Sequence, residues 1–261
     1  MKPTSGKRKM NSEHPTYPNP TIQEAICEIH FRLSDDFDWK PALLGELYKH
    51  IEPDFPDLEP VTQVDFLFQV GPKGSGPMLR PSQQMMRYKH ISRNLLIQFS
   101  KNILTVNVLP KYEGWEQMSA DIFYAWGKVC GVIKPASITK IGLRYIDRIE
   151  RTHPDEFPSE WLAPSDYIPK SALSSLPGFL YRLETRMNQD NKLIVTLGEP
   201  IDDSGRQSDA IVLDIDCIVE REIGVDNNAI SQETEKLHDF AWQVFSASMT
   251  PRLERLLQGG E

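Results

Sequence analysis

Cysteine is scarce in this sequence, and the three that occur, Cys27, Cys130 and Cys217, lie far apart. They form no CxxC pair, which excludes the common redox and zinc motifs built on that spacing. A small, odd set of cysteines favours reduced thiols, so we expect a cytoplasmic protein. No run approaches the roughly 18 apolar residues of a membrane-spanning helix. The basic N-terminus leads into polar residues and prolines, so no signal peptide is expected.

Motifs that would identify a reaction are missing as well. The sequence has no Gly-x-Ser-x-Gly, no His-Glu-x-x-His and no Cys/His spacing suited to zinc, and its six histidines are scattered. The Gly/Pro-rich segment 71–82 has a composition near that of a phosphate loop. It lacks the Gly-Lys-Ser/Thr ending, and its prolines remove amides that a phosphate would need, so we interpret it as a connector. We therefore expect no cofactor and no metal, and favour a non-enzymatic role.

Basic residues are outnumbered, and the charge is unevenly distributed. Of 261 residues, 29 are Lys or Arg and 37 are Asp or Glu, a net charge of −8. Residues 1–19 hold four bases and one acid, while residues 199–240 hold three bases and twelve acids. Because residues 1–19 have almost no large apolar side chains, we predict a disordered basic arm there. Residues 20–261 are long enough to form one domain with a sizeable core.

Hydrophobic periodicity predicts strands and helices in a definite order. An alternating pattern over 24–33 indicates a half-buried strand, and helical spacing follows from Pro41 to Pro53. Further strands are expected near 64–70, 84–91, 95–100, 103–109, 138–150, 179–187, 192–198 and 210–220. Long helices are expected after Gly114 and from Ser231, which we assign as an N-cap, and a short one after Thr250-Pro251.

Consecutive strands joined by short turns favour antiparallel pairing and the α+β class. We predict an antiparallel sheet with long helices packed on one face. Two units, each a run of strands followed by a helix, would occupy 20–150 and 177–261. The irregular, proline-containing segment 151–176 would join these halves.

Four segments resemble a sporadically distributed family of uncharacterised bacterial proteins. Tyr17-Pro-Asn-Pro-Thr-Ile-Gln-Glu-Ala25 is similar to the family's opening, and Leu109-Pro-Lys-Tyr-Glu-Gly-Trp-Glu116 to its mid-chain motif. Ile141-Gly-Leu-Arg-Tyr-Ile-Asp-Arg-Ile-Glu150 resembles its most recognisable strand, and the segment Phe245 to Leu257 its closing helix. The resemblance implies no activity or catalytic residue. It implies horizontally mobile genes that often lie beside defence or mobile-element genes.

The predicted strands place many charges on the sheet face opposite the helices. Ile29, Phe31, Leu143, Tyr145, Tyr181, Leu183, Leu213 and Ile215 would face the helices. The opposite positions are His30, Arg32, Arg144, Arg148, Arg182, Glu184, Arg186, Asp214 and Asp216. One interpretation is cross-strand ion pairing on a solvated surface. The other is a binding face, whose arginines suit carboxylates or phosphates.

Three smaller candidates carry weaker signals. Asp214 and Asp216 share one strand face and so could hold Mg²⁺, although acids alternating on a solvated strand are common. His30 is the one histidine on the charged face, and we favour a surface residue over a general base. Tyr112 and Trp115 flank a helix start, where aromatics usually pack as a staple or core, although they could instead line a ligand surface.

We therefore expect an interaction or accessory protein with a protein partner, in a horizontally transferred defence or toxin–antitoxin-like module. An open sheet offers an edge or a face for self-association, so a homodimer is also expected. The alternatives are an RNA- or nucleotide-binding protein that uses the arginine face, which the net charge disfavours, and a small-ligand sensor with a pocket between sheet and helices.

Overall fold

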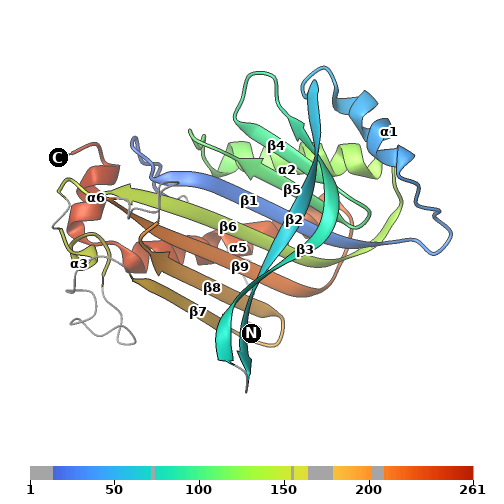
Figure 1. The fold of residues 1–261 in the computed structure, drawn as a ribbon. Coiled ribbons are helices and arrows are strands. Elements are labelled where there is room, and N and C mark those ends of the chain that lie inside the picture. Colours follow the sequence, from blue (N-terminus) through green and yellow to red (C-terminus); the bar gives the residue numbers. More distant parts are fainter. Residues whose placement is uncertain (1–13, 72–73, 154–155, 164–178, 201–208, 261) are drawn as a thin grey trace, which may run out of the picture.

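The computed structural model describes residues 14–71, 74–153, 156–163, 179–200 and 209–260. These residues form nine strands in one sheet, together with helices, so the predicted α+β class and antiparallel sheet are confirmed (Figure 1). The strands are β1 (Ile22–Leu33), β2 (Asp57–Gly71), β3 (Gly74–Lys89), β4 (Leu95–Phe99), β5 (Ile103–Val108), β6 (Pro135–Glu150), β7 (Leu180–Arg186), β8 (Asn191–Gly198) and β9 (Ala210–Ile223).

Strands β1 and β6 lie side by side at the middle of the sheet. The spatial order is β2-β3-β4-β5-β1-β6-β9-β8-β7, and every pairing is antiparallel. After β1 the chain moves to the outer edge of the sheet at β2 and returns through β3 and β4 to β5, which pairs with β1. After β6 it moves to the opposite edge at β7 and returns through β8 to β9, which pairs with β6. The sheet is continuous across this centre: β1 to β6, from the predicted unit 20–150, and β7 to β9, from the predicted unit 177–261, belong to the same sheet.

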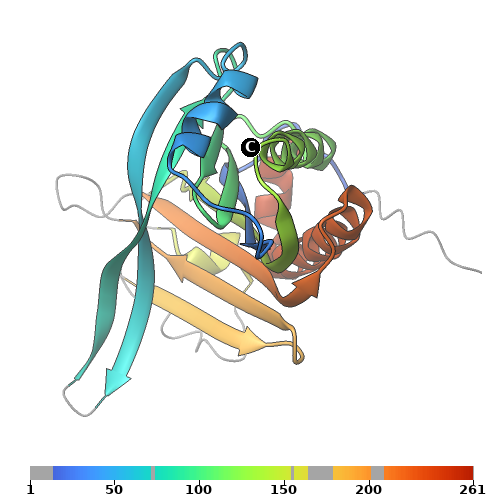
Figure 2. The ribbon, with the colours of Figure 1, turned by 90° about the vertical axis from the view of Figure 1, so that its right-hand side faces the viewer.

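The helices are α1 (Ala42–Ile51), α2 (Trp115–Cys130), α3 (Pro158–Trp161), α5 (Asn227–Ser248) and α6 (Pro251–Leu257). α5 packs on β9 and β6, and α2 packs on β5. Figure 2 shows α2 and α5 on one side of the sheet and the β2–β3 hairpin on the other. Between helices and strands lies a continuous core that includes Trp126, Phe99 and Ile122. Among the described residues, no helix combines the length and apolar character needed to cross a membrane.

The structure describes the predicted basic arm only from His14 onward. These last six residues contact the C-terminal helices. The His14 Nε2 atom lies 2.7 Å from Asp239 Oδ1 on α5, and the ring of Tyr17 lies 6.1 Å from that of Trp242. The amide of Asn19 donates to the carbonyl of Leu257 on α6 at 3.1 Å. The remainder of the arm, 1–13, lies outside the described residues.

Segment 71–82, expected as a connector, is instead part of the β2–β3 hairpin apart from residues 72–73, which are not described. β3 pairs with β4 only from Met86 to Lys89. Closer to the hairpin turn, its one strand neighbour among the described residues is β2. Alternate amides there need no partner strand, which is why a strand with prolines at 77 and 81 can form.

The second long helix begins five residues earlier than expected, because its N-cap is Asp226 rather than Ser231. The Asp226 Oδ1 atom accepts a hydrogen bond from the amide of Ala229 at 3.0 Å. An aspartate satisfies this position as well as a serine does, and the polar first turn hid the start of the helix from the hydrophobic pattern. The predicted cap at Thr250 is correct, because its Oγ1 accepts from the Leu253 amide.

Candidate functional site

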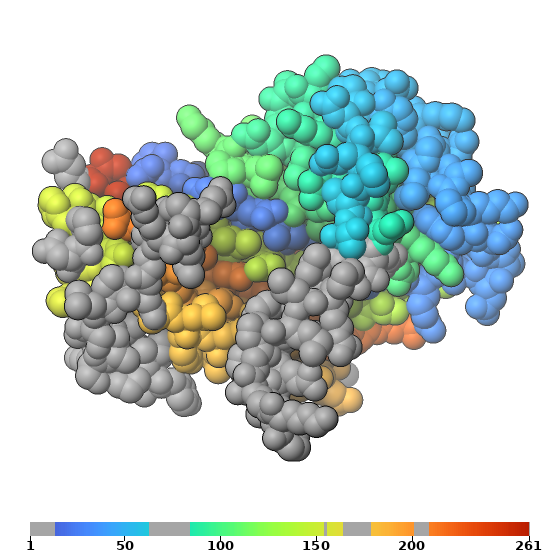
Figure 3. Space-filling view, viewed as in Figure 1, coloured from blue at the N-terminus to red at the C-terminus, as the bar shows by residue number. Residues whose placement is uncertain are grey.

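One face of the sheet is opposite α2 and α5, and we call it the open face. Its side chains come from alternate positions of five neighbouring strands, as the registers require. It comprises Glu24, Ile26, Glu28, His30, Lys140, Gly142, Arg144, Ile146, Arg148, Arg182, Glu184, Arg186, Lys192, Ile194, Thr196, Asp214, Asp216 and Ile218. Figure 3 looks onto this face, where the gold β7–β8 pair reaches the surface.

The remaining positions of these strands, which alternate with those of the open face, are mostly apolar, as the sequence pattern indicates. Ile29, Leu143 and Ile215 are almost fully buried against the helices, whereas Tyr181 and Leu183 on β7 are only half-buried. On this helix-facing side, the side chains become more exposed toward the β7 edge, because α5 covers β6 and β9 more than the outer strands.

Arg144 and Asp214 form the centre of the open face. The guanidinium donates from Nε to Oδ1 and from Nη2 to Oδ2, both at 2.7 Å. Asp216, the direct cross-strand neighbour of Arg144, receives no hydrogen bond or ion pair from the described residues. Burial raises the pKa of Asp216 to about 6; the charge of Arg144 lowers it and that of Asp214 raises it.

A second group lies on β1 and β6, where one carboxylate contacts both a histidine and a lysine. Glu28 Oε1 lies 2.5 Å from His30 Nε2 and accepts from Lys140 Nζ at 3.1 Å. Burial raises the pKa of Glu28, but the hydrogen bonds and charges of His30 and Lys140 outweigh it and lower the pKa to about 2. His30 is thus the hydrogen-bond partner of a carboxylate that also binds Lys140.

The predicted arginines on the outer strands are also matched by acceptors. Arg182 Nε donates to Glu184 Oε1 at 3.0 Å, and Lys192 Nζ lies 2.8 Å from the other carboxylate oxygen. Arg148 Nε donates to Glu150 at 2.5 Å, and Arg186 Nη1 reaches the carbonyl of Gln189 at 3.4 Å. Arg144, Arg148 and Arg182 are therefore in separate ion pairs, and Arg186 is bonded to a backbone carbonyl.

These pairings limit the chemistry of the face. Both oxygens of Asp214 already accept from Arg144, so the Asp214–Asp216 pair does not present two carboxylates to a cation. Within the part of the chain that the structure describes, no three His, Cys, Asp or Glu side chains are placed to hold a metal ion. Arg32 is likewise engaged outside this cluster, with Glu222 at 2.7 Å.

Tyr112 and Trp115 lie on the other side of the sheet, in an aromatic cluster. The Tyr112 ring meets Tyr145 edge-to-face with centroids 6.0 Å apart, and Trp115 stacks on the imidazole of His238 at 4.3 Å. Tyr145 Oη lies 2.9 Å from His238 Nδ1. The loop before α2 is thus packed against α5 and β6, which agrees with the structural interpretation of these two aromatics.

His238 and Tyr145 were not singled out by the sequence. Burial lowers the pKa of His238 to about 4, with the charge of His14 lowering it and that of Asp239 raising it. The imidazole is therefore neutral at neutral pH, and its Nδ1 shares a hydrogen bond with the Tyr145 hydroxyl. The sequence feature that could have identified His238 is its position next to Leu237, in the apolar stripe of α5.

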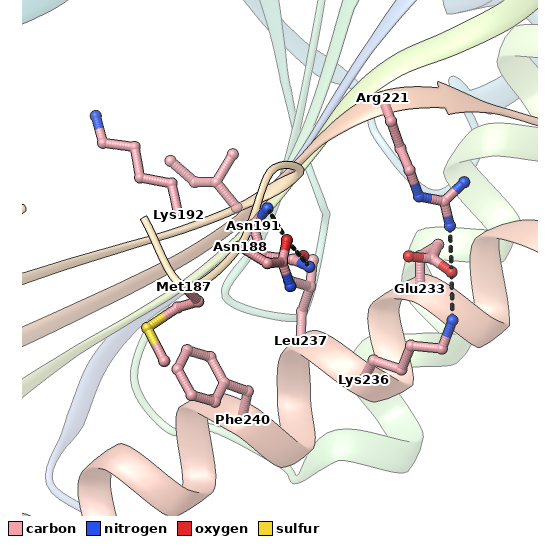
Figure 4. Close-up of a pocket in the computed structure, with 10 residues that line it drawn as sticks. Met187, Asn188, Asn191, Lys192, Arg221, Glu233, Lys236, Leu237 and Phe240 are labelled. Carbon is pink, nitrogen blue, oxygen red and sulfur yellow. Dashed lines mark hydrogen bonds and ion pairs between the residues drawn. The ribbon is translucent and has the colours of Figure 1, made fainter. Parts of the chain in front are cut away.

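A shallow depression of about 280 Å³ lies between the β7–β8 turn and α5 (Figure 4). Met187 and Phe240 lie close together at one end. At the other end Glu233 Oε1 holds Arg221 Nη2 at 2.9 Å and Lys236 Nζ at 2.6 Å. The depression thus combines an apolar wall with a bridged pair of cations.

No protein-family profile matches the chain, and no curated protein is significantly similar to it. The function must therefore be argued from the residues themselves.

Proposed function

We propose that the protein is a non-enzymatic interaction protein that binds a protein partner through the open face. The observation that carries the proposal is the matching of charges on this face. Arg144, Lys140 and Arg182 each meet a carboxylate of the same chain. A surface with little local excess charge suits the polar, mixed interface of a non-obligate protein complex.

Half-buried aliphatic side chains lie among these ion pairs and supply anchors for a partner. Ile26 is the neighbour of Arg144 on one side, and Asp216 and then Ile194 follow on the other. Ile146 lies two residues further along β6, on the same face. Apolar side chains surrounded by satisfied polar groups are the usual composition of an interface centre and its surroundings.

The same pairing disfavours the RNA or nucleotide alternative. An anion that approaches Arg144 would compete with a bidentate carboxylate that already satisfies two donors. The helices α2 and α5 act in this proposal as the scaffold that covers the opposite face and holds the strands rigid. The family resemblance is consistent with such an accessory role in a mobile defence or toxin–antitoxin-like module.

The test is differential capture with a matched control. The purified protein is used as bait in lysate of its native cells, beside an Ile146→Ala/Ile194→Ala variant and an Ile91→Ala variant. Ile91 is 67% exposed in the β3–β4 connection, outside the open face. We expect one protein to be captured by the wild type and by I91A and lost with the double variant, with Tm lowered by only a few degrees.

Binding is then measured by calorimetry with the captured protein in purified form. Equal capture by all three baits would contradict the proposal. Capture that disappears after ribonuclease treatment and falls steeply with salt would instead support the nucleic-acid alternative.

The depression at the β7–β8 turn supports a second candidate, a small-ligand sensor. Its apolar wall and the cations Arg221 and Lys236 suit an amphiphilic anion of modest size. Anilinonaphthalene sulfonate serves as a probe. We expect saturable fluorescence that Phe240→Ala reduces and Ile91→Ala leaves unchanged, and equal signals from both variants would exclude this site.

A further inference from the structure

The outer edge of the sheet at β7 has a sequence that is complementary to itself. β7 pairs with β8 on one side and is the last strand in the sheet order, at the lower border of the sheet in Figure 1. Among the described residues no strand pairs with its other side. Such an edge presents backbone N–H and C=O groups that can pair with another strand.

The residues of β7 run Leu-Tyr-Arg-Leu-Glu-Thr-Arg from Leu180 to Arg186. When a second copy is placed antiparallel about a two-fold axis at Leu183, Arg182 lies opposite Glu184 of that copy, and Glu184 lies opposite its Arg182. Both residues belong to the open face, where directly opposed side chains come within about 4.5–5.5 Å at Cβ. Two opposite-charge pairs therefore form across the axis.

The other side of the strand is compatible with the same register. There Leu183 meets Leu183 of the second copy, and Tyr181 meets Thr185. These side chains are half-buried in the monomer, so apolar surface remains available at the edge. Aromatic and β-branched residues are favourable cross-strand neighbours.

Neighbouring registers are worse, which selects this one. A shift of the axis to Arg182 sets arginine against arginine, and a shift to Glu184 sets glutamate against glutamate and Arg182 against Arg186. A shift by half a step would invert the faces of one copy relative to the other. An edge guarded only by lysines would repel every register. An axis at Thr185 would also set Glu184 against Arg186, but it pairs only residues 184–186 of β7, whereas the axis at Leu183 pairs all seven residues of the strand.

We propose that β7 pairs with β7 of a second copy, so that the two nine-stranded sheets form one continuous sheet in a symmetric homodimer. The axis runs perpendicular to the sheet. Both open faces then lie on one side of the dimer, and α2 and α5 of both copies lie on the other. The dimer does not depend on the partner protein proposed above.

Charge swapping tests the pairing. Arg182 Nη2 lies 2.9 Å from Glu184 Oε1 within one chain, and that local pair survives when both residues are exchanged. Sedimentation velocity is measured over a range of concentrations for wild type, Arg182→Glu, and Arg182→Glu/Glu184→Arg. We expect a wild-type dimer, a rise of at least tenfold in the dimer Kd for the single variant, and recovery in the exchanged variant.

Cysteine cross-linking tests the register independently of these charges. In a Cys130→Ser background, Leu183→Cys should form a disulfide-linked dimer under mild oxidation, since directly paired Cα atoms lie 4.5–5.5 Å apart. Thr185→Cys is the matched control, because two such cysteines would be separated by about four residues along the strand. A wild-type protein that stays monomeric, or equal cross-linking at 183 and 185, would overturn the proposal.

Discussion

Arg144 reaches past its direct cross-strand neighbour, Asp216, to form a bidentate pair with Asp214 two residues away on β9. Gly142 lies on the same face beside the carboxylate of Asp216, whose Oδ1 would be in ordinary van der Waals contact, at 3.7 Å, with a Cβ at that position. The guanidinium therefore satisfies one aspartate fully and influences the other only through its charge. This division makes Asp214 structural and leaves Asp216 as the titratable carboxyl of the open face.

Neutralising Asp214 should destabilise the fold, because its side chain is only 12% exposed and the Arg144 guanidinium would lose its counter-ion. We expect Asp214→Asn to lower the free energy of unfolding by about 1.5–3 kcal/mol, the range for hydrogen bonds to charged groups. Urea denaturation measures this change.

Glu222→Gln is the matched control, since it removes the same charge from a carboxylate that faces Arg32. Glu222 is 71% exposed and Arg32 63%, so the loss should stay below about 1 kcal/mol. Equal losses for the two variants would show that the Arg144–Asp214 pair is no stronger than an ordinary surface pair.

The carboxyl of Asp147 should make stability fall as pH rises. Burial raises the pKa of Asp147 to about 7, and the charge of Asp214 also raises it. The Thr21 hydroxyl, which donates to Oδ1 at 2.8 Å, lowers it. Between about pH 4 and 7 the folded state holds a proton that the unfolded chain has released. The free energy of unfolding therefore declines by up to about 1.4 kcal/mol per pH unit and levels off above pH 7.

Asp147→Asn removes this titration and keeps an oxygen that accepts from Thr21. Relative to wild type, the variant should gain stability steadily from pH 4 to pH 7, measured by urea denaturation at each pH. A difference between the two proteins that does not vary with pH would show that Asp147 ionises normally.

Most of the sheet could be predicted because its strands alternate between apolar and charged residues. That alternation located β1 and β6 and assigned the parity of Arg144, Asp214 and Asp216. Periodicity reports which residues share a face, but it does not report which charges meet. Arg144 pairs with Asp214, which is diagonal to it, and not with its direct neighbour Asp216; this depends on the strand register, which exists only once β6 and β9 have paired.

The hairpin and the aromatic cluster show a different limit. The β2–β3 ribbon is held by backbone pairing, so a segment rich in glycine and proline carries no hydrophobic signature. His238 was missed because one histidine at helical spacing has no special pattern. Its significance comes from Trp115 and Tyr145, which lie more than 90 residues away and meet it only in three dimensions.

The ion pair between Arg151 and Glu199 should be among the most sensitive sites in the molecule. Their side chains are 3% and 1% exposed, and Arg151 Nη1 lies 3.0 Å from Glu199 Oε1. Arg151 also donates to the carbonyls of Glu156 and Asp209. Removal of one partner leaves a buried charge uncompensated, so we expect Glu199→Gln to cost about 3–5 kcal/mol.

A double variant separates this penalty from the net value of the pair. Arg151→Met/Glu199→Met removes both charges and should recover part of the loss, because an apolar pair can replace a buried ion pair. The measurement is thermal and urea unfolding of the three proteins. A cost below about 1 kcal/mol for E199Q would mean that water reaches this pair.

His238 should contribute the opposite pH dependence to that of Asp147. Burial lowers the pKa of His238 to about 4 in the folded state. Between pH 4 and 6.5 the unfolded chain therefore binds a proton at this residue that the folded state does not. The contribution of His238 to the free energy of unfolding is therefore fully present above about pH 6.5. It is lost as the pH falls, by up to about 1.4 kcal/mol per pH unit. His238→Asn keeps a group that can hydrogen-bond to the Tyr145 hydroxyl, as donor or as acceptor, and removes the titration. We expect the wild type to lose stability relative to H238N as the pH is lowered from 6.5 to 4, and the His238 ring proton signals to titrate near pH 4. A midpoint near 6.5 would mean that the stacking of Trp115 on the imidazole does not exclude water.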